Sequence, residues 1–416
     1  MTSQGVNRGK TLIEGASRFE RQPCLFARLI APSFHKILDR IDRGLEQGSI
    51  LGHLPDGTTR LLGGRNPGFD AIVHLKDWRG VMRLATNGSV GWYQAWEAGE
   101  WESPDLVPVF AIFNHNAVTL GQTGRAKGPF RWGAKIAHWL NRNSKAGSER
   151  NIQAHYDLGN DFYAQWLDPT MSYSSAIFAD GDAGGDALEA AQRRKWDHLA
   201  RRLGKPETLL EVGCGWGALA DHFAARGSKV TAISLSDEQL AWARERHDPS
   251  IEFLKQDYRD TSGQFDGIIS VEMVEAVGRE FWPSYFDCIA RNLKPGGRAA
   301  IQYISFRDDL FDAYAASADF IQAYIFPGGL LIRESEFRRL AAERGLVWQD
   351  QENFALDYAE TLKIWRERFE LAIDEARLPA GFDQRFARLW RYYLAYCEAG
   401  FRGGGIDVHQ VTLVKS

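Results

Sequence analysis

Residues 209–217 decide the fold class of this chain, and they read Leu209-Leu210-Glu211-Val212-Gly213-Cys214-Gly215-Trp216-Gly217. An apolar run that ends in a glycine cluster predicts a buried strand, Thr208–Val212, and then a tight turn. The residues that follow, Ala218–Ala225, predict a helix. Glycine lets a ligand approach the backbone closely, and the first N–H groups of a helix are free to bind it. The stretch therefore predicts a ligand-binding strand–loop–helix unit, although a GxGxG motif alone also fits a structural turn without a ligand.

The same alternation of strand and helix continues over residues 151–416. Apolar runs predict strands at Lys229–Leu235, Ile268–Val271 and Arg298–Ile304, and Asp237–Glu245 predicts a helix. This βαβα order is typical of an α/β protein with a doubly wound parallel sheet. From about Phe306 onward the chain is richer in helix signals and in aromatic residues.

Residues 1–122 have a different character and predict a small α+β domain. One apolar helix face is formed by Phe34, Ile37, Leu38, Ile41 and Leu45, which recur at spacings of three and four. Turn signals follow at 55–57, 63–64 and 87–88. Asn87-Gly88 predicts a β-hairpin between Val81–Ala85 and Val90–Tyr93.

Residues 123–150 form a basic connector between these regions. Seven Lys and Arg residues alternate with aromatic side chains, and the only acid is Glu149. The composition fits a segment that binds at a membrane surface. It also fits a solvated linker whose Trp side chains pack on their own domain, and both interpretations stay open.

Composition excludes several classes of protein. The 416 residues carry 50 basic and 54 acidic side chains, a balance that argues against a nucleic-acid binder. The four cysteines, Cys24, Cys214, Cys288 and Cys397, include no CxxC pair, and the ten histidines show no metal-binding spacing. We found neither an apolar run of about 18 residues nor a signal peptide, so we expect a cytoplasmic protein without a metal.

Three further features identify the ligand of the glycine loop. Glu211 precedes the loop, Gln256-Asp257-Tyr258 follows a predicted third strand, and Lys294-Pro295-Gly296-Gly297 precedes a later one. A dinucleotide site would usually carry an acid about 20 residues after the loop, but the second strand ends in Ile233-Ser234-Leu235-Ser236. The set instead resembles the class I fold of S-adenosylmethionine (SAM) methyltransferases. That resemblance implies the following cofactor-binding residues: Gly213 and Gly215 in the loop, Ser234 and Gln239 at the ribose and methionine, and Asp257 and Tyr258 at the adenine.

Several longer motifs resemble the cyclopropane-fatty-acyl-phospholipid synthase family. Residues 151–163 read NIQAHYDLGNDFY, 167–176 read LDPTMSYSSA, and 272–278 read EMVEAVG. Further matches are YIFPGG at 324–329, DYAETL at 357–362 and GIDV at 405–408. They run in order across roughly 155–415, and residues 1–122 resemble the lipid-binding domain that bacterial members carry in front.

The resemblance implies methyl transfer from SAM to the cis double bond of an unsaturated phospholipid acyl chain. The resulting carbocation would lose a proton to a bound bicarbonate and close a cyclopropane ring. Glu275, Tyr358 and the backbone of Ile304 match the bicarbonate-binding positions, and Tyr173 and Ser174 match positions beside SAM. Two positions depart: Ser175 stands where many members have Cys, and Gln302 where many have His. His155 fits a structural or a catalytic histidine equally well.

We therefore expect a SAM-dependent enzyme that forms cyclopropane fatty acids. The expected base is bicarbonate, although Ser175 and Gln302 depart from the family pattern at its binding site. A re-aimed base would instead give a methylene or methyl-branched chain. The alternatives are an N-methyltransferase for a small amine and a non-catalytic lipid-binding protein. The expected partner is unsaturated phospholipid at the inner face of the membrane, and relatives suggest a homodimer.

Overall fold

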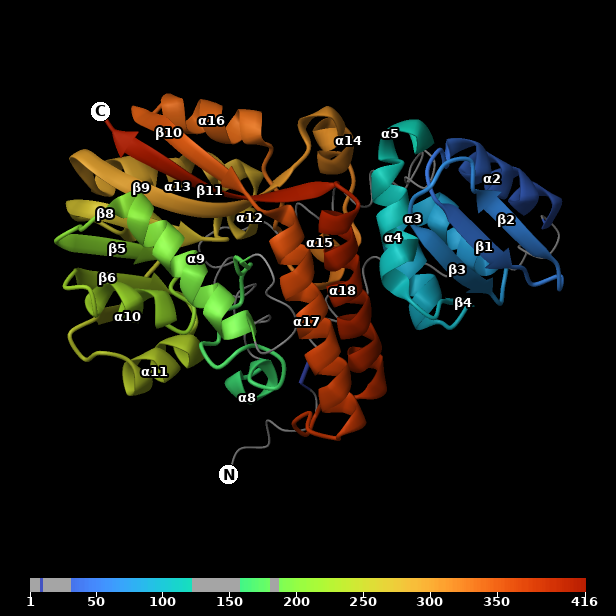
Figure 1. Ribbon diagram of the computed structural model, residues 1–416, viewed down its shortest axis with the longest axis horizontal. Helices are drawn as coiled ribbons and strands as arrows, with labels where there is room; N and C mark the ends of the chain where they lie inside the picture. Colours follow the sequence, from blue (N-terminus) through green and yellow to red (C-terminus); the bar gives the residue numbers. More distant parts are fainter. Residues whose placement is uncertain (1–7, 10–30, 122–157, 180–186) are drawn as a thin grey trace.

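The computed structural model describes residues 8–9, 31–121, 158–179 and 187–416, and these contain two β-sheets (Figure 1). The larger sheet and its helices lie on one side of the molecule and the smaller sheet on the other, with two long helices between them (Figure 1). The connector 123–150 and His155 lie outside the described residues, so the interpretations of both stay predictions.

The larger sheet has seven strands in the order β10-β11-β9-β8-β5-β6-β7. All of its paired neighbours from β9 to β7 are parallel, and β11 runs antiparallel to both β9 and β10. The strands are β5 (Thr208–Val212), β6 (Lys229–Ser234), β7 (Glu252–Lys255), β8 (Phe265–Val271), β9 (Leu293–Phe306), β10 (Leu346–Asn353) and β11 (Ile406–Lys415). The predicted α/β sheet is therefore confirmed, with one antiparallel strand that the sequence pattern did not indicate.

Helices cover both faces of this sheet because successive residues of a strand point to opposite sides. Leu209 belongs to an apolar cluster that includes residues of α9 (Leu188–Leu203), α10 (Ala218–Ala224) and α11 (Asp237–Arg246). Leu210 belongs to the apolar cluster on the other face, with α13 (Trp282–Asn292) and α16 (Glu334–Ala342). Two helical turns, α8 (Asn160–Tyr163) and α12 (Val274–Val277), lie in the loops near the carboxyl ends of the strands.

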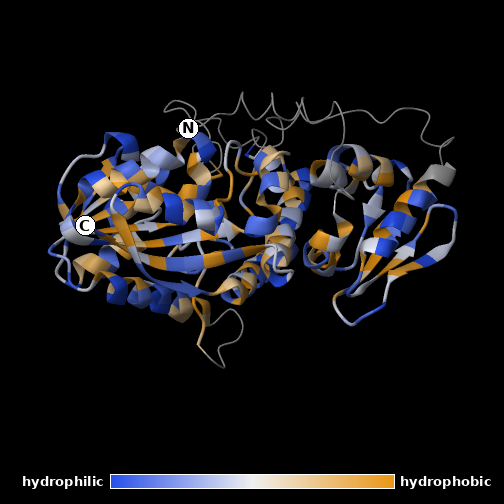
Figure 2. Ribbon diagram, turned by 90° about the horizontal axis from the view of Figure 1, so that it is seen from above, coloured by the Kyte–Doolittle hydropathy of each residue, from blue (hydrophilic) through white to orange (hydrophobic). Residues whose placement is uncertain are grey.

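Residues 31–121, which we call the N-terminal unit, contain the second sheet, with strand order β2-β1-β3-β4. Its strands are β1 (Ser49–His53), β2 (Thr59–Gly63), β3 (Asp70–Leu75) and β4 (Trp101–Glu102). Its helices are α2 (Ala31–Gly44), α3 (Arg79–Glu97), α4 (Leu106–His115) and α5 (Ala117–Leu120). Along β3 buried and exposed residues alternate, and hydrophobic and hydrophilic residues alternate along the small sheet in Figure 2. The predicted apolar face of α2 is confirmed, since Phe34, Leu38 and Ile41 are buried.

The hairpin predicted at Asn87-Gly88 is wrong. Residues Arg79–Glu97 form a helix with a kink at Gly88, where φ is 58° and ψ is −139°. A Cβ at Gly91 would stand 2.1 Å from the carbonyl oxygen of Arg83, so the two halves of the helix pack very closely. A hairpin turn and a helix kink both need a positive φ, which the Asn-Gly pair permits. The kinked helix forms here because it buries Tyr93 and Trp96 on one helical face.

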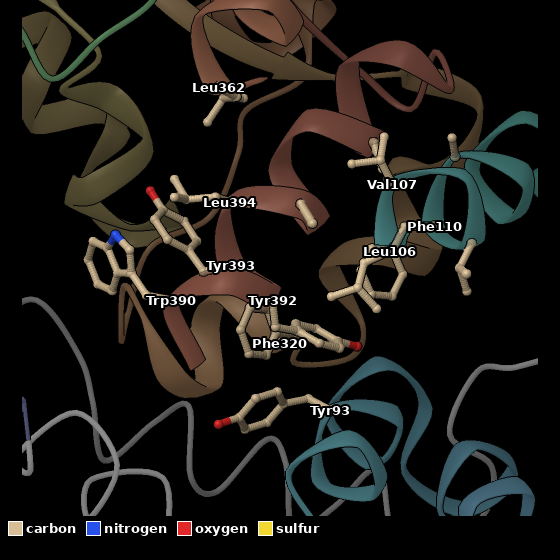
Figure 3. Packing of buried hydrophobic residues seen from close by; sticks show 14 of the residues in the cluster. Tyr93, Leu106, Val107, Phe110, Phe320, Leu362, Trp390, Tyr392, Tyr393 and Leu394 are labelled. Atoms are coloured by element: carbon tan, nitrogen blue, oxygen red, sulfur yellow. The ribbon is translucent and has the colours of Figure 1, made fainter. Parts of the chain in front are cut away.

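Four helices of the C-terminal region join the two sheets. They are α14 (Phe311–Ala315), α15 (Phe320–Tyr324), α17 (Ala355–Asp374) and α18 (Gln384–Arg402). Tyr93 of α3 lies 4.8 Å from Phe320 and 5.0 Å from Tyr392 between ring centroids, and Phe110 of α4 lies 4.8 Å from Tyr392 (Figure 3). One apolar core therefore continues from the N-terminal unit into the C-terminal helices.

Within the described ranges, no helix is long and apolar enough to cross a membrane. The same residues contain no cluster of three or more His, Cys, Asp or Glu side chains that could hold a metal ion.

Candidate active site

Two cavities meet at the carboxyl ends of the parallel strands. The first has a volume of about 150 Å³ and is lined by the glycine loop after β5. The second has a volume of about 480 Å³ and is lined mostly by apolar and aromatic side chains. Tyr173, Glu272 and Met273 line both cavities, so a reaction between their occupants would take place beside these residues.

The glycine loop has the backbone that close approach of a ligand requires. Gly213 and Gly215 have φ values of 84° and 52°, which favour glycine. A Cβ on Gly213 would stand 2.4 Å from the side chain of Met273, whereas one on Gly215 would meet nothing within 4 Å. Gly213 therefore allows Met273 to sit at the junction of the cavities, and Gly215 leaves backbone open to the first cavity.

A buried lysine, Lys195, and a buried glutamate, Glu211, lie in the wall of this first cavity. Lys195 of α9 donates a hydrogen bond to Ser174 Oγ over 2.7 Å. Burial lowers the pKa of Lys195 to about 8 and raises the pKa of Glu211 to about 8, while each charge partly offsets the shift of the other. Glu211 Oε2 has no hydrogen-bond partner among the described residues, so it is placed to accept one from a ligand.

The other residues predicted to bind SAM are distributed over both cavities. Ser234 Oγ and Gln239 Oε1 are 3.2 Å apart and line the first cavity together with Tyr258. Asp257 lines the second cavity, and its carboxylate pairs with Arg259 at 2.6 Å. Tyr173 donates to or accepts from Tyr393 between hydroxyl oxygens 2.6 Å apart. The roles of these side chains toward the parts of SAM remain predictions.

The centre of the site is Glu272, which sequence reasoning did not single out. Its Oε1 accepts hydrogen bonds from Ser175 N at 2.9 Å and Gln302 Nε2 at 2.8 Å, and its Oε2 accepts one from the Tyr358 hydroxyl at 2.6 Å. Removal from water raises the pKa of Glu272, and these three donors hold the rise back because they favour the ionised form. Its φ of 52° is rare for a side chain other than glycine, and such backbone is typical of functional sites. The sequence signal was its place directly after the strand Phe265–Val271, where parallel strands present ligand-binding side chains.

Of the five residues predicted for catalysis, Ser175, Gln302 and Tyr358 contact Glu272, and Ile304 contacts the fifth, Glu275. Glu275 Oε1 accepts a hydrogen bond from the backbone N–H of Ile304, and its Oε2 has no hydrogen-bond partner among the described residues. Tyr358, Glu275 and Ile304 line the second cavity. Ser175 and Gln302 are fully buried and line neither cavity, and the Ser175 hydroxyl donates to the carbonyl of Ala176. The groups expected to hold bicarbonate are therefore brought together, but three of the donors face a carboxylate of the protein itself.

Comparison with known proteins identifies the family. The family model described as mycolic acid cyclopropane synthetase matches residues 143–411. The chain belongs to this family. It is 38% identical to the tuberculostearic acid methyltransferase of Mycobacterium tuberculosis, over 87% of this chain and 88% of that protein. It is 34% identical to the cyclopropane-fatty-acyl-phospholipid synthase of Escherichia coli K12, over 84% of this chain and 89% of that protein.

Solved structures of mycolic acid cyclopropane synthetase family members agree with the fold. The cyclopropane synthase MmaA2 of Mycobacterium tuberculosis aligns with a TM-score of 0.58 and 28% identity, covering 64% of this chain and 98% of that one. The mycolic acid cyclopropane synthase CmaA1 complexed with SAH and CTAB aligns with a TM-score of 0.59, the same identity and the same coverage. The chain described here is thus a SAM-dependent methyltransferase that modifies lipid acyl chains.

The first cavity fits SAM by its own chemistry. Glu211 Oε2 and Gln239 Nε2 are buried without hydrogen-bond partners among the described residues and suit the polar groups of the cofactor. The open backbone at Gly215 provides a surface for close approach. When bound, SAM would supply an electrophilic methyl group.

Replacing Glu275 with Gln should remove a pH-dependent loss of stability. Burial, with the charge of Glu272 as a second cause, raises the pKa of Glu275 from 4.5 to about 8. A carboxyl with a raised folded-state pKa binds its proton more tightly in the folded protein, so the parent loses stability as pH rises through this window. The Gln variant still accepts the Ile304 N–H but does not titrate. The melting temperature of the variant minus that of the parent should increase from pH 4.5 to about pH 8 and then level off. A constant difference over this pH range would contradict the raised pKa of Glu275.

Proposed function

We propose that this enzyme transfers a methyl group from SAM to the cis double bond of an unsaturated phospholipid acyl chain, and that the product keeps a double bond. The product would be a methyl-branched or methylene-bearing chain. The observation that carries this choice is the Glu272 carboxylate. It accepts a hydrogen bond from the Tyr358 hydroxyl, which the family resemblance assigns to bicarbonate, and two more from Ser175 N and Gln302 Nε2. Because these donors already bind a carboxylate of the protein, the proposed reaction does not use bicarbonate.

In the proposed reaction Glu272 acts as the base. The π electrons of the acyl double bond form the new carbon–methyl bond, the sulfur–methyl bond breaks, and its electrons stay on sulfur. A neighbouring chain carbon becomes positive. Glu272 then accepts a proton from a carbon of the acyl chain or the new methyl, and the C–H electrons form the product double bond. The lipid gains one CH₂ unit, and Glu272 releases the proton on product exchange.

The surroundings of Glu272 support a cationic intermediate on an apolar substrate. Tyr173, Tyr258, Tyr358 and Tyr393 line the second cavity, and aromatic faces stabilise a cation by about 0.5–2 kcal/mol each. A small amine would not need an apolar cavity of about 480 Å³, which argues against the N-methyltransferase alternative. The largely apolar lining of the cavity suits an acyl chain.

Cyclopropane formation is the second candidate. Glu275 Oε2 has no hydrogen-bond partner among the described residues and lies in the second cavity, so a base aimed at the new methyl group is available if it ionises. The Escherichia coli relative is named for this product. The raised pKa of Glu275, about 8, counts against its ionisation at neutral pH.

The substrate lies in a bilayer, so we also propose that the enzyme works at the inner membrane surface. The basic, aromatic composition of residues 123–150 supports this. Flotation with anionic and with neutral vesicles tests it, and equal, negligible binding to both would contradict it.

Proton NMR of the lipid product tests the proposed reaction. Purified enzyme, SAM and vesicles of cis-monounsaturated phospholipid are incubated with and without added bicarbonate, and the fatty acids are released. New exomethylene (=CH₂) or branched-methyl signals that do not depend on bicarbonate are expected. Upfield cyclopropane signals would establish the second candidate, and the absence of any one-carbon product would refute both.

A further inference from the structure

The second cavity, which we call the acyl cavity, is not confined to the region that carries the SAM loop. From Glu272 and Met273 it extends to α3, α4 and α5, where Leu84, Phe113 and Ala117 line it. All three are half-buried, and each belongs to the N-terminal unit. The match to the family model begins only at residue 143, so this part of the wall lies outside the matched region.

The N-terminal wall is held firmly against the rest of the site. Phe320 N donates to Ser89 Oγ over 3.2 Å, one residue beyond the kink of α3. Gln94 Nε2 donates to the Tyr324 hydroxyl over 3.3 Å, and Arg388 donates to the carbonyl of Trp96 over 2.6 Å. Together with the aromatic contacts of Tyr93 and Phe110, these bonds fix the distance between the wall and Glu272 (Figure 3).

The kink that replaced the predicted hairpin brings α3 to this cavity. Asn87, Gly88 and Ser89 all line it, and only a positive φ at Gly88 lets the helix change direction there. A straight helix would continue past this point and would not present the same three residues to the cavity.

We propose that the N-terminal unit sets the register of the acyl chain and so determines which double-bond position reaches Glu272. The inference rests on the proposed function and adds a specificity determinant to it. A chain that fills an apolar cavity with one fixed wall places each carbon at a defined distance from that wall. Moving the wall therefore changes which carbon lies at the junction of the two cavities.

Substitutions on α4 and α5 test the register. Ala117→Trp fills the cavity, and Phe113→Ala enlarges it. Val118→Trp is the matched control, because Val118 is the next residue, is 57% exposed and does not line the cavity. Each variant receives mixed vesicles of two phosphatidylcholines of equal chain length whose cis double bonds lie two carbons apart, and the two products are quantified by fragmentation mass spectrometry.

We expect Ala117→Trp and Phe113→Ala to change the product ratio by about tenfold, in opposite directions. Val118→Trp should stay within about twofold of the parent. If Ala117→Trp fails to fold, Phe113→Ala alone decides. Product ratios within about twofold of the parent for both cavity variants would refute the proposal that the N-terminal unit sets the register. An equal change in Val118→Trp would refute it as well. A parent that modifies neither lipid would refute the proposed function instead, which separates the two failures.

Discussion

Glu272→Gln should lower kcat for one-carbon addition by about 10²–10⁴-fold, the usual contribution of a general base. The amide is nearly the same size as the carboxylate but cannot accept a proton. SAM affinity, measured by calorimetry, should change much less than kcat, because the amide preserves the shape of the first cavity, which Glu272 lines. Removal from water raises the pKa of Glu272 above 4.5. As the pH is lowered, the rate of the parent enzyme should therefore begin to fall before pH 4.5 is reached, because Glu272 becomes protonated.

Glu275→Gln is the matched control for this experiment. Glu275 holds its proton at neutral pH, since its pKa is about 8, so a neutral amide should preserve most of the activity. If Glu275→Gln abolished turnover while Glu272→Gln did not, Glu275 would be the base and the cyclopropane candidate would gain support.

Glu272→Gly offers a rescue test of the same assignment. Glycine suits the φ of 52° at this position, and its small size leaves Ser175 N, Gln302 Nε2 and the Tyr358 hydroxyl without their acceptor. Formate or bicarbonate should then restore part of the lost rate, whereas neither should affect the parent. Failure of both anions to restore activity in a folded variant would argue against an anion at this place.

Gly213→Ala should weaken SAM binding by about 10–100-fold, a loss of about 1–3 kcal/mol of binding free energy. The new methyl group would stand 2.4 Å from Met273 and push that side chain into the junction of the two cavities. Calorimetric titration with SAM measures the loss. Met273→Ala in the same chain should recover part of the affinity, because it removes the clash.

Gly227→Ala separates strain from contact. Gly227 has a φ of 94° and a Cβ there would meet nothing within 4 Å. The variant should lose stability from strain but bind SAM like the parent. Equal SAM affinity in Gly213→Ala and Gly227→Ala would show that the contact with Met273 has no role.

The sequence was enough to predict the SAM fold, the family and four of the parallel strands, β5, β6, β8 and β9. These properties depend on local features: glycines that permit a positive φ after Val212, and apolar runs whose length matches a buried strand. The same locality explains the wrong hairpin, since Asn87-Gly88 permits a turn and a helix kink equally. Only the burial of Tyr93 and Trp96 against distant residues distinguishes them.

The tertiary structure is needed to see which groups surround the Glu272 carboxylate. Glu272 meets the Ser175 amide from 97 residues away and the Tyr358 hydroxyl from 86 residues away. No spacing along the chain encodes that carboxylate, because the contacts arise where a strand end, a loop and a long helix converge. The N-terminal wall of the acyl cavity depends in the same way on side chains that pack across two sheets, so only the folded chain reveals it.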